Sequence, residues 1–383
     1  MSIIAQAIPL ALYVHWPWCV QKCPYCDFNS HVARDADEVR YARALLDDWA
    51  LQLPALSGRA ISSVFFGGGT PSLAHPRFIA AVLERVAKDA TLTSDCEITL
   101  EANPGTVDAA HFAGYYAAGV NRLSLGIQSF DTELLRQIGR IHDGNQAKQA
   151  IEVARKIGFD NINLDLMVGL PSQTEKTALA DIETALSFAP EHLSHYQLTL
   201  EPNTPFFARP PKSLPDDDLA DNLQLLCHQR LEAAGFDRYE VSAWQAKRGN
   251  ASRHNLNYWQ FGDYVGIGAG AHGKLTLADG TIVRTDHAKS PVRYVQDIES
   301  GLLAKTERID TQNLSFEFLM NALRLREGVC LERYKERTGL GLDAIEKQWQ
   351  QGVRDGFLQP MTHSLVTTTL GYRYLNHVLE AFL

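Results

Sequence analysis

Three cysteines near the start of the chain have a spacing that suits an iron–sulfur cluster. Cys19, Cys23 and Cys26 form a CxxxCxxC pattern directly after an apolar, strand-like segment, Leu10–Val14. Thiolates are the usual ligands of a 4Fe-4S cube, and three of them leave the fourth iron without a protein ligand. Such an iron can bind a small chelating molecule and pass an electron to it.

Other uses of cysteine fit the sequence less well. A structural zinc site usually has four ligands in two CxxC pairs, and no second pair is present. Disulfides are disfavoured by the short spacings and by the lack of any sign of secretion. The remaining cysteines stand alone among apolar neighbours and are predicted to be inert buried thiols: Cys96, Cys227 and Cys330.

Glycines and polar residues follow several of the predicted strands. Phe65–Ser72 contains three consecutive glycines, which allow a ligand to approach the backbone closely; no Gly-Lys-Ser/Thr follows, so the segment is not a P-loop. Glu101, Gln128 and Asp165 lie at or near the ends of later strands, and Arg140 lies twelve residues beyond Gln128. Each alone is more often a core or turn residue, but their repeated placement favours a shared site.

The elements that must position these residues are predicted from the alternation of strand-like and helix-like segments. Helical periodicity is clearest over 38–53, 76–90 and 145–157. This order favours parallel strands with helices outside, as in a complete or partial (β/α) barrel, although spacing does not exclude an open doubly wound sheet. The predicted strands are 10–15, 62–67, 96–102, 122–128, 161–168 and 193–200.

After about residue 300 the pattern changes to helices at 315–325, 331–338, 343–355 and 370–382, with a short hairpin at 357–367. Three helices with a hairpin resemble a winged-helix module. We therefore predict two domains, a barrel core over residues 1–300 and a small, mainly helical domain over residues 301–383.

Composition and charge exclude several function classes. The hydrophobic fraction of 45% and the charged fraction of 21% are ordinary for a globular protein. The net charge of −9, with ten basic and ten acidic residues after residue 300, argues against a nucleic-acid partner. No apolar run is long enough to span a membrane, and no basic region precedes the apolar start. We expect a reducing, cytoplasmic location.

The cysteine pattern, with Tyr25 before its last cysteine, resembles the signature of the radical S-adenosylmethionine (SAM) superfamily. In that superfamily the open iron chelates the amino and carboxylate groups of SAM, and reduction cleaves SAM to a 5′-deoxyadenosyl radical. The cysteine pattern and the glycine and polar segments at the ends of the later strands together resemble the oxygen-independent coproporphyrinogen III oxidase family. This resemblance covers nearly the whole chain. That resemblance implies these SAM-contacting residues: Tyr13, Tyr25, Gly68, Gly69, Thr70, Glu101, Gln128, Arg140, Asp165 and Gln197.

The chemistry of these side chains agrees with such roles. The carboxylates of Glu101 and Asp165 can accept hydrogen bonds from the ribose hydroxyls or the amino group of SAM, and Arg140 can pair with the SAM carboxylate.

Two features depart from the enzymes of that family and resemble its HemW-type haem-chaperone branch. The enzymes carry a fourth cysteine two residues after the third, where this chain has Phe28, and their N-terminal extension is absent here. In addition, the segment from His254 to Trp259 matches the HNxxYW motif of that branch. Histidine is the commonest haem ligand, but the residues alone leave packing and iron binding both open. The resemblance implies that His254 binds haem, with His272 as a weaker alternative.

Two functions are therefore predicted, in order of preference. The first is a chaperone that binds haem and delivers it to acceptor haem proteins, such as respiratory proteins associated with a membrane; the cluster and SAM would support a homodimer or haem release. The alternative is a radical-SAM enzyme that decarboxylates propionates of coproporphyrinogen III in porphyrin biosynthesis. A third hypothesis is a radical-SAM enzyme with another substrate.

Overall fold

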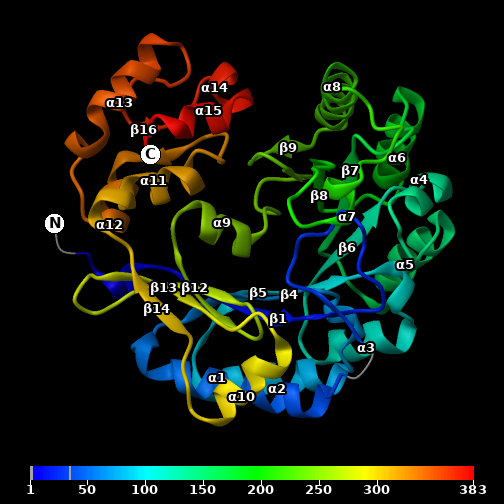
Figure 1. Cartoon of the computed structure of the whole chain (residues 1–383), viewed down its shortest axis with the longest axis horizontal. Helices are drawn as coiled ribbons and strands as arrows, with labels where there is room; N and C mark the ends of the chain where they lie inside the picture. Colours follow the sequence, from blue (N-terminus) through cyan, green and yellow to red (C-terminus); the bar gives the residue numbers. More distant parts are fainter. Residues whose placement is uncertain (1–2, 34–35) are drawn as a thin grey trace.

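The computed structural model describes residues 3–33 and 36–383, which form one large mixed sheet with helices on its outer face (Figure 1). The sheet has the strand order β14-β13-β12-β11-β1-β4-β5-β6-β7-β8-β10-β9. In the part of the chain described, β14 and β9 do not pair with each other, so the sheet is open. Its parallel centre consists of β1 (Leu10–Trp16), β4 (Ile61–Gly68), β5 (Leu92–Ala102), β6 (Arg122–Gln128), β7 (Ile162–Val168) and β8 (His192–Gln197).

The helices that connect these strands bury one apolar face each against the sheet. In α2, Phe78, Ile79, Val82, Leu83 and Val86 are buried at helical spacing. Burying such side chains stabilises the fold by roughly 1.5–3 kcal/mol each. The same layer contains α1 (Glu38–Leu56), α2 (Pro76–Asp89), α3 (Ala109–Ala117), α5 (Gly144–Ile157), α6 (Glu175–Ser187), α8 (Asp217–Ala233) and α10 (Pro291–Glu299).

Both edges of the sheet contain antiparallel strands that the sequence patterns did not predict. On one side, β11 pairs parallel with β1 and continues into an antiparallel meander; on the other, β10 pairs antiparallel with β8. These short edge strands are β9 (Asp237–Arg238), β10 (Ala243–Gln245), β11 (Asp263–Ile267), β12 (His272–Thr276), β13 (Ile282–Asp286) and β14 (Lys305–Arg308).

The helix α9 (Arg253–Trp259) lies on the face of the sheet opposite to α1 and α2 (Figure 1). It contacts β1 and β4 there, and also α11 (Thr311–Ala322). The HNxxYW motif therefore lies between the central sheet and the C-terminal helices.

The C-terminal helices share a second hydrophobic core with earlier parts of the chain. Tyr239, Phe261 and Ile282 pack in the same cluster as Phe318 and Trp349. The division into domains at residue 300 stays a prediction. The helices of this region are α11, α12 (Leu331–Thr338), α13 (Asp343–Arg354), α14 (Thr369–Arg373) and α15 (Leu375–Glu380).

One detail of the C-terminal prediction is wrong and another is incomplete. The segment predicted as one last helix is interrupted at Tyr374, whose φ and ψ of −110° and 41° are not helical. The arms of the predicted hairpin do pair, because Leu358 and Thr367 form an antiparallel bridge and the Gln359 N–H donates to the Val366 carbonyl. A pairing that was not predicted adds to it: β16 (Ser364–Leu365) also pairs with β15 (Val329–Cys330). The pairing partner is distant in sequence, so local turn signals could not reveal it.

The predicted fold class is confirmed as α/β with a large parallel sheet and a C-terminal helical region. The predicted strand 122–128 matches β6, and the others differ from the observed strands mainly at their ends. Among the described residues, none of the helices is both long enough and apolar enough to span a membrane.

Candidate functional site

A cavity of about 750 Å³ opens at the carboxyl ends of β4 to β8. Such cavities are the usual place for ligands in parallel α/β sheets. All but three of the predicted site residues line it, and the three outside it are Tyr13, His254 and the weaker haem candidate His272. Those in its lining are Cys19, Cys23, Tyr25, Cys26, Gly68, Gly69, Thr70, Glu101, Gln128, Arg140, Asp165 and Gln197.

The three cysteines reach the cavity from the loop that follows β1. Cys19 ends the short strand β2 (Trp18–Cys19), and the Cys26 N–H donates to the Cys23 carbonyl in a turn. The Thr70 hydroxyl donates to Cys19 Sγ at 3.3 Å, and Arg140 Nη1 lies 3.7 Å from Cys23 Sγ. Burial raises the pKa of the Cys19 and Cys26 thiols, so in the metal-free protein these two thiols hold their protons more tightly than usual.

The donor set of this loop, three thiols with Thr70 and Arg140 beside two of them, is chemically suited to an iron–sulfur cluster. In residues 3–33 and 36–383, no three His, Cys, Asp or Glu side chains are close enough to share one metal ion. A cube has a separate iron for each thiolate, so its ligands need not converge on one point. Arg140 and Thr70 beside the sulfurs are donors that can stabilise their negative charge once the protons are displaced.

The glycine motif at the end of β4 allows a close approach between backbone segments. A side chain at Gly69 would meet the backbone of Pro17 at 2.8 Å, and one at Gly68 would meet the His15 ring at 2.6 Å. The Gly69 N–H donates to Trp16 and the Thr70 N–H to Trp18. These N–H groups therefore fix the cysteine loop to β4, and the ligand-binding role predicted for the motif stays a prediction.

Two half-buried carboxyl groups, Glu101 at the end of β5 and Asp165 on β7, face the cavity. Burial and then the nearby Asp165 raise the pKa of Glu101 to about 8, and burial raises the pKa of Asp165 as well. Glu101 accepts from the Gly68 N–H, and Asp165 accepts from Ser124 and Asn163. A pair of acids with raised pKa values favours a cationic ligand, because a positive charge between them would offset both burial and mutual repulsion. SAM carries both an ammonium and a sulfonium group.

The backbone of Gln128 is strained at the end of β6. Its φ of 67° is in the left-handed region, which is unfavourable for residues with a side chain. The Tyr196 hydroxyl donates to Gln128 Oε1 at 2.9 Å and so fixes the side chain. Strain of this kind often accompanies a functional site, and here it holds the Gln128 amide in the cavity wall.

Several lining residues were missed by the sequence analysis. Ser124 lies four residues before Gln128 in β6, and Ser194 and Tyr196 are two residues apart in β8. Residues at even spacing share one face of a strand, so strand periodicity could have indicated Ser124, Ser194 and Tyr196. Arg324 and Ser242 also line the cavity, but they come from segments without any local motif.

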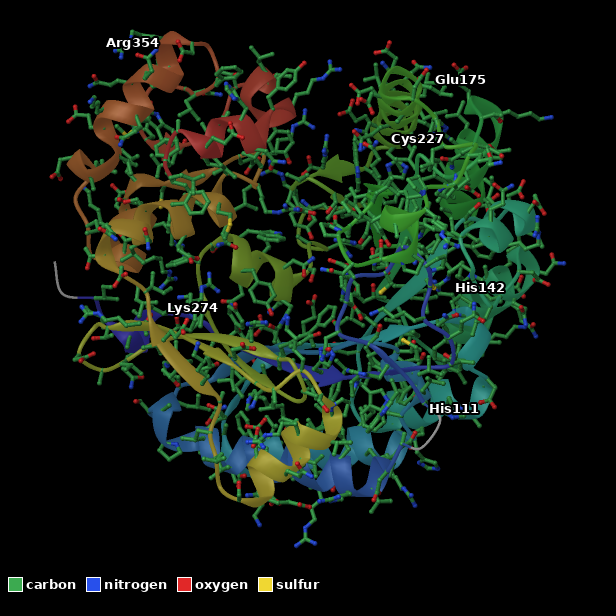
Figure 2. The ribbon with its side chains drawn as sticks, in the orientation of Figure 1. His111, His142, Glu175, Cys227, Lys274 and Arg354 are labelled. Carbon is green, nitrogen blue, oxygen red and sulfur yellow. The ribbon has the colours of Figure 1, made fainter. Side chains whose placement is uncertain are left out.

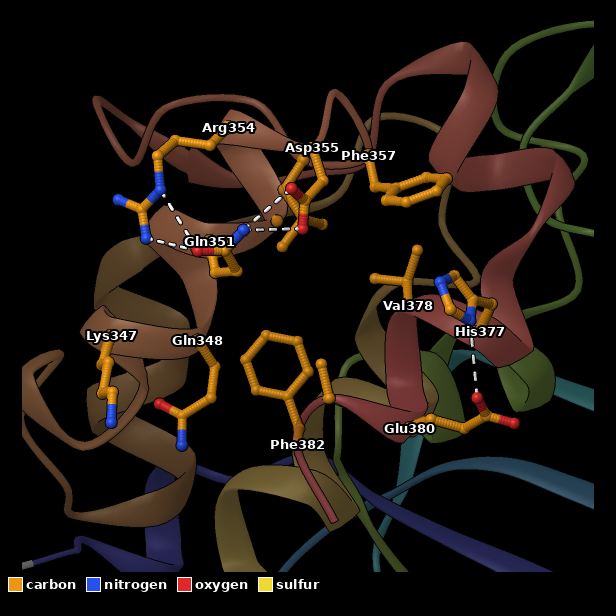
Figure 3. A pocket seen from close by; sticks show the side chains of 13 residues that line it. Lys347, Gln348, Gln351, Arg354, Asp355, Phe357, His377, Val378, Glu380 and Phe382 are labelled. Carbon is orange, nitrogen blue, oxygen red and sulfur yellow. Dashed lines mark hydrogen bonds and ion pairs between the residues drawn. The ribbon is translucent and has the colours of Figure 1, made fainter.

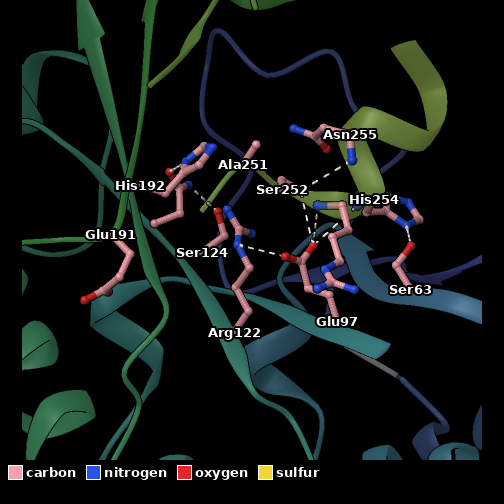
Figure 4. Close-up of polar contacts among 12 residues, drawn as sticks. Ser63, Glu97, Arg122, Ser124, Glu191, His192, Ala251, Ser252, His254 and Asn255 are labelled. Atoms are coloured by element: carbon pink, nitrogen blue, oxygen red, sulfur yellow. Dashed lines mark hydrogen bonds and ion pairs between the residues drawn. The ribbon is translucent and has the colours of Figure 1, made fainter. Parts of the chain in front are cut away.

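His254 lies in a different environment, shown in Figure 4. Its side chain is 2% exposed, with Nδ1 3.2 Å from Ser63 Oγ and Nε2 3.0 Å from the Tyr258 hydroxyl. Its ring stacks on Phe65 with centroids 4.9 Å apart, and burial lowers the pKa of His254 to about 3. Both ring nitrogens are thus partnered, and iron binding would require one of these contacts to be exchanged.

Tyr13 belongs to the same aromatic cluster as His254. Its ring centroid lies 6.3 Å from that of His254, and its hydroxyl is 3.0 Å from His15 Nδ1. His15 Nε2 in turn contacts the Asn29 carbonyl in the loop after the cysteines. Tyr13 therefore links α9 to the cysteine loop through packing, without itself lining the cavity. His272, the weaker haem candidate, is exposed and lies 3.6 Å from Asp286.

A buried ion pair anchors the start of α9 (Figure 4). Glu97 accepts a hydrogen bond from the Arg253 N–H at 2.9 Å, and Arg122 Nε lies 3.9 Å from its other oxygen. A carboxylate at a helix N-terminus is favoured by the helix dipole. The motif helix is therefore fixed to β5 and β6 below the cavity.

The remaining cysteines lie outside the cavity. Burial raises the pKa of Cys96 to about 11 and that of Cys227, labelled on α8 in Figure 2, to about 12. These two are the inert thiols predicted from the sequence. Cys330 is exposed, so the prediction that it is buried is wrong.

A second cavity, of about 600 Å³, lies between α13 and α15 in the C-terminal region (Figure 3). Gln351, Phe357 and Phe382 are among its lining residues, and none of the predicted site residues is. The chemistry of the molecule is therefore expected in the cavity at the strand ends.

Comparison with known proteins agrees with this geometry. Residues 13–185 match the model of the radical SAM superfamily, and residues 309–374 match the HemN C-terminal domain. The chain is 45% identical to "Heme chaperone HemW" of Escherichia coli (strain K12) over 377 residues, which cover 98% of each protein. It belongs to the HemW family. A second HemW protein, from Haemophilus influenzae, is 45% identical over 98% of each chain.

The chain is also similar in sequence to a mitochondrial protein, and it shares its fold with a solved enzyme structure. "Radical S-adenosyl methionine domain-containing protein 1, mitochondrial" of mouse is 40% identical over 85% of this chain and 75% of its own. The coproporphyrinogen III oxidase HemN from Escherichia coli superposes with a TM-score of 0.82 over 98% of this chain and 90% of that one. Its sequence identity is only 21%, so the likeness to HemN shows a shared fold alone.

Proposed function

We propose that this protein is a haem chaperone, which binds haem and delivers it to acceptor haem proteins. The observation that carries the proposal is the near full-length similarity to HemW proteins that bear that name. The HNxxYW segment and Phe28 in place of a fourth cysteine support it. Phe28 is 61% exposed and lines the cavity, so an apolar ring stands where the enzymes have a thiol.

The same proposal includes a 4Fe-4S cluster and SAM in the cavity. Cys19, Cys23 and Cys26 would hold the cluster, and Glu101 with Asp165 would receive the positive charge of SAM. When bound, a cluster with an open iron supplies a chelating site and an electron. This chain's own residues would orient the ligand, with Arg140 beside a sulfur and the two half-buried carboxyl groups in the cavity wall.

The haem site belongs to the proposal as well. His254 remains the predicted ligand, although its ring nitrogens contact Ser63 and Tyr258 in the structure described above. Acceptors among membrane-associated respiratory proteins, a cluster-dependent homodimer and a cytoplasmic location are further parts of this proposal.

The alternative function is oxidative decarboxylation of coproporphyrinogen III. It is favoured by the grouping of the predicted SAM residues around one cavity. A preparation that cleaves SAM with a competent reductant, yet forms no protoporphyrinogen, would exclude this alternative.

The decisive experiment is an anaerobic haem titration of the cluster-reconstituted protein, followed by absorbance. We expect saturation near one haem per chain. The His254→Ala variant is titrated alongside, with His272→Ala as a matched control; a changed spectrum in the first and not in the second would place the ligand. No saturable binding by the unmodified protein would reject the chaperone function and make porphyrinogen turnover the next assay.

A further inference from the structure

The cavity at the strand ends has one wall residue from the C-terminal region, Arg324. This residue follows α11, and its side chain is 30% exposed. Two other basic residues, Arg140 and Lys22, also line the cavity. Arg140 already donates to the Gly126 carbonyl and contacts Cys23, and Lys22 donates to the Phe28 carbonyl in the cysteine loop. Arg324 is therefore the cavity cation that is independent of the cysteine loop.

The guanidinium of Arg324 is held in place from two sides. Nη2 donates to Glu240 at 3.1 Å, and the group lies over the Trp259 ring at 4.3 Å from its centroid. Glu240 is 1% exposed, and its other oxygen accepts from the N–H and hydroxyl of Ser242. A side chain fixed in this way loses little freedom on binding a ligand.

Arg324 keeps hydrogen-bonding capacity that the protein does not use. A guanidinium has five N–H donors in a planar fork that matches a carboxylate. Its Nε is buried and has no hydrogen-bond partner within the described part of the chain, so a ligand does not reach this donor. The side chain is nevertheless 30% exposed, and its exposed part suits a carboxylate that enters from the cavity.

The rest of the lining indicates what kind of carboxylate would fit. Phe28, Met167, Leu198 and Tyr196 provide apolar and aromatic surface in the same cavity. The lining also contains the carboxyl groups of Asp27, Glu101, Asp165 and Glu201. The apolar surface together with Arg324 suits an amphipathic ligand that has a flat apolar body and an acidic edge. The Trp259 contact further ties this cation to the HNxxYW motif.

We propose that Arg324, held by Glu240 and Trp259, binds a propionate carboxylate of haem in this cavity. The inference rests on the proposed haem-binding function and adds to it a subsite formed by the C-terminal region. The interaction is an ion pair with hydrogen bonds and involves no covalent change.

The test compares haem with haem dimethyl ester, in which both propionates are esterified. Each is titrated into the full-length, cluster-reconstituted protein and into Arg324→Met. We expect the variant to bind haem about tenfold to a hundredfold more weakly, as for loss of a charged hydrogen bond, and to bind the ester as tightly as the unmodified protein does. Equal haem affinities, or an equal loss for haem and ester, would overturn the proposal.

Two further variants separate binding from folding. Arg324→Met leaves the buried Glu240 unpaired, so the double variant Arg324→Met/Glu240→Gln removes that charge as well and is expected to show the same loss for haem. The matched control is Arg326→Met, because Arg326 pairs with Glu232, is 53% exposed and does not line the cavity. The control is expected to bind haem normally, and a loss of the same size in it would contradict the assignment.

SAM provides the other carboxylate that could enter the cavity. We expect SAM affinity to be unchanged in Arg324→Met, and a tenfold loss would instead assign the subsite to SAM. If the unmodified protein binds neither haem nor its ester, the proposed chaperone function is rejected. If the unmodified protein and Arg324→Met bind haem equally well, only the assignment of Arg324 is rejected.

Discussion

The strand-end cavity and the α9 motif helix contain the two groups of residues that the sequence singled out, and their environments differ. At the cavity, the half-buried acids Glu101 and Asp165 have raised pKa values, and Arg140 lies beside the Cys23 sulfur. At α9, His254 is buried, neutral and partnered on both ring nitrogens. The comparison teaches that a cationic ligand in the cavity would offset the desolvation and mutual repulsion of the two acids. At His254, in contrast, a ligand would first have to break the hydrogen bonds that the ring already makes.

The largest expected effect is the loss of the cluster. Cys19→Ala removes one of three thiolates, and we expect iron–sulfur absorbance to disappear from the reconstituted protein. The cooperative thermal transition should remain, because the main core consists of the sheet and its outer helices. Cys330→Ala, at an exposed cysteine outside the cavity, should retain the cluster. Loss of cooperative unfolding in Cys19→Ala would contradict this separation of site and core.

The second prediction tests the packing role of His254. His254→Ala removes a buried ring and two hydrogen bonds, and we expect it to lower the free energy of unfolding by about 2–4 kcal/mol. Chemical denaturation measures this change. His272→Ala, at an exposed residue, should change it by less than about 0.5 kcal/mol. Equal stabilities of the two variants would show that α9 is not held through His254.

The third prediction concerns the acid pair of the cavity. Because the pKa of Glu101 is about 8, most of this group is protonated at pH 7 in the ligand-free site. A bound cation lowers that pKa, so we expect SAM binding at pH 7 to release a proton. Calorimetry in buffers of different ionisation enthalpy measures the release.

A substitution at the same position sharpens this prediction. Glu101→Gln should abolish the proton release and weaken SAM binding by about tenfold to a hundredfold. Glu201→Gln is the matched control, since Glu201 also lines the cavity and is half-buried, but its carboxylate already accepts a hydrogen bond from Thr199. Unchanged proton release in Glu101→Gln would assign the proton to another group.

The smallest expected effect is on the pH dependence of folding stability, through Asp181, which lies outside both the cavity and α9. Burial raises the pKa of Asp181 from 3.8 to about 6, where it accepts from Ser129 and the Phe130 N–H. The folded state then binds a proton more tightly than the unfolded state, so this contribution is complete below pH 4 and is lost as pH rises through 6. The slope reaches at most about 1.4 kcal/mol per pH unit.

Asp181→Asn should flatten the stability profile between pH 4 and pH 6. Denaturation at several pH values checks this expectation. An unchanged slope in the variant would show that other groups control the profile.

The sequence by itself determined that the three predicted cysteine ligands share one loop, and it indicated part of the cavity lining. Short spacing fixes Cys19, Cys23 and Cys26 in one loop, and alternation of strands and helices brings the ends of parallel strands to one edge. Glu101, Gln128 and Asp165 could therefore be placed together without coordinates. Their positions follow from local periodicity, which is a property of neighbouring residues.

Only the tertiary structure decided where α9, the edge strands and Arg324 lie. The contacts of His254 with Ser63, and of Arg324 with Glu240 and Trp259, join segments far apart in the chain. The same motif residues could have been exposed or buried, since short polar–aromatic segments carry no periodicity that fixes their orientation. The helix α9 packs between the sheet and α11 of the C-terminal region. This packing buries His254, whereas the residues at the strand ends line an open cavity.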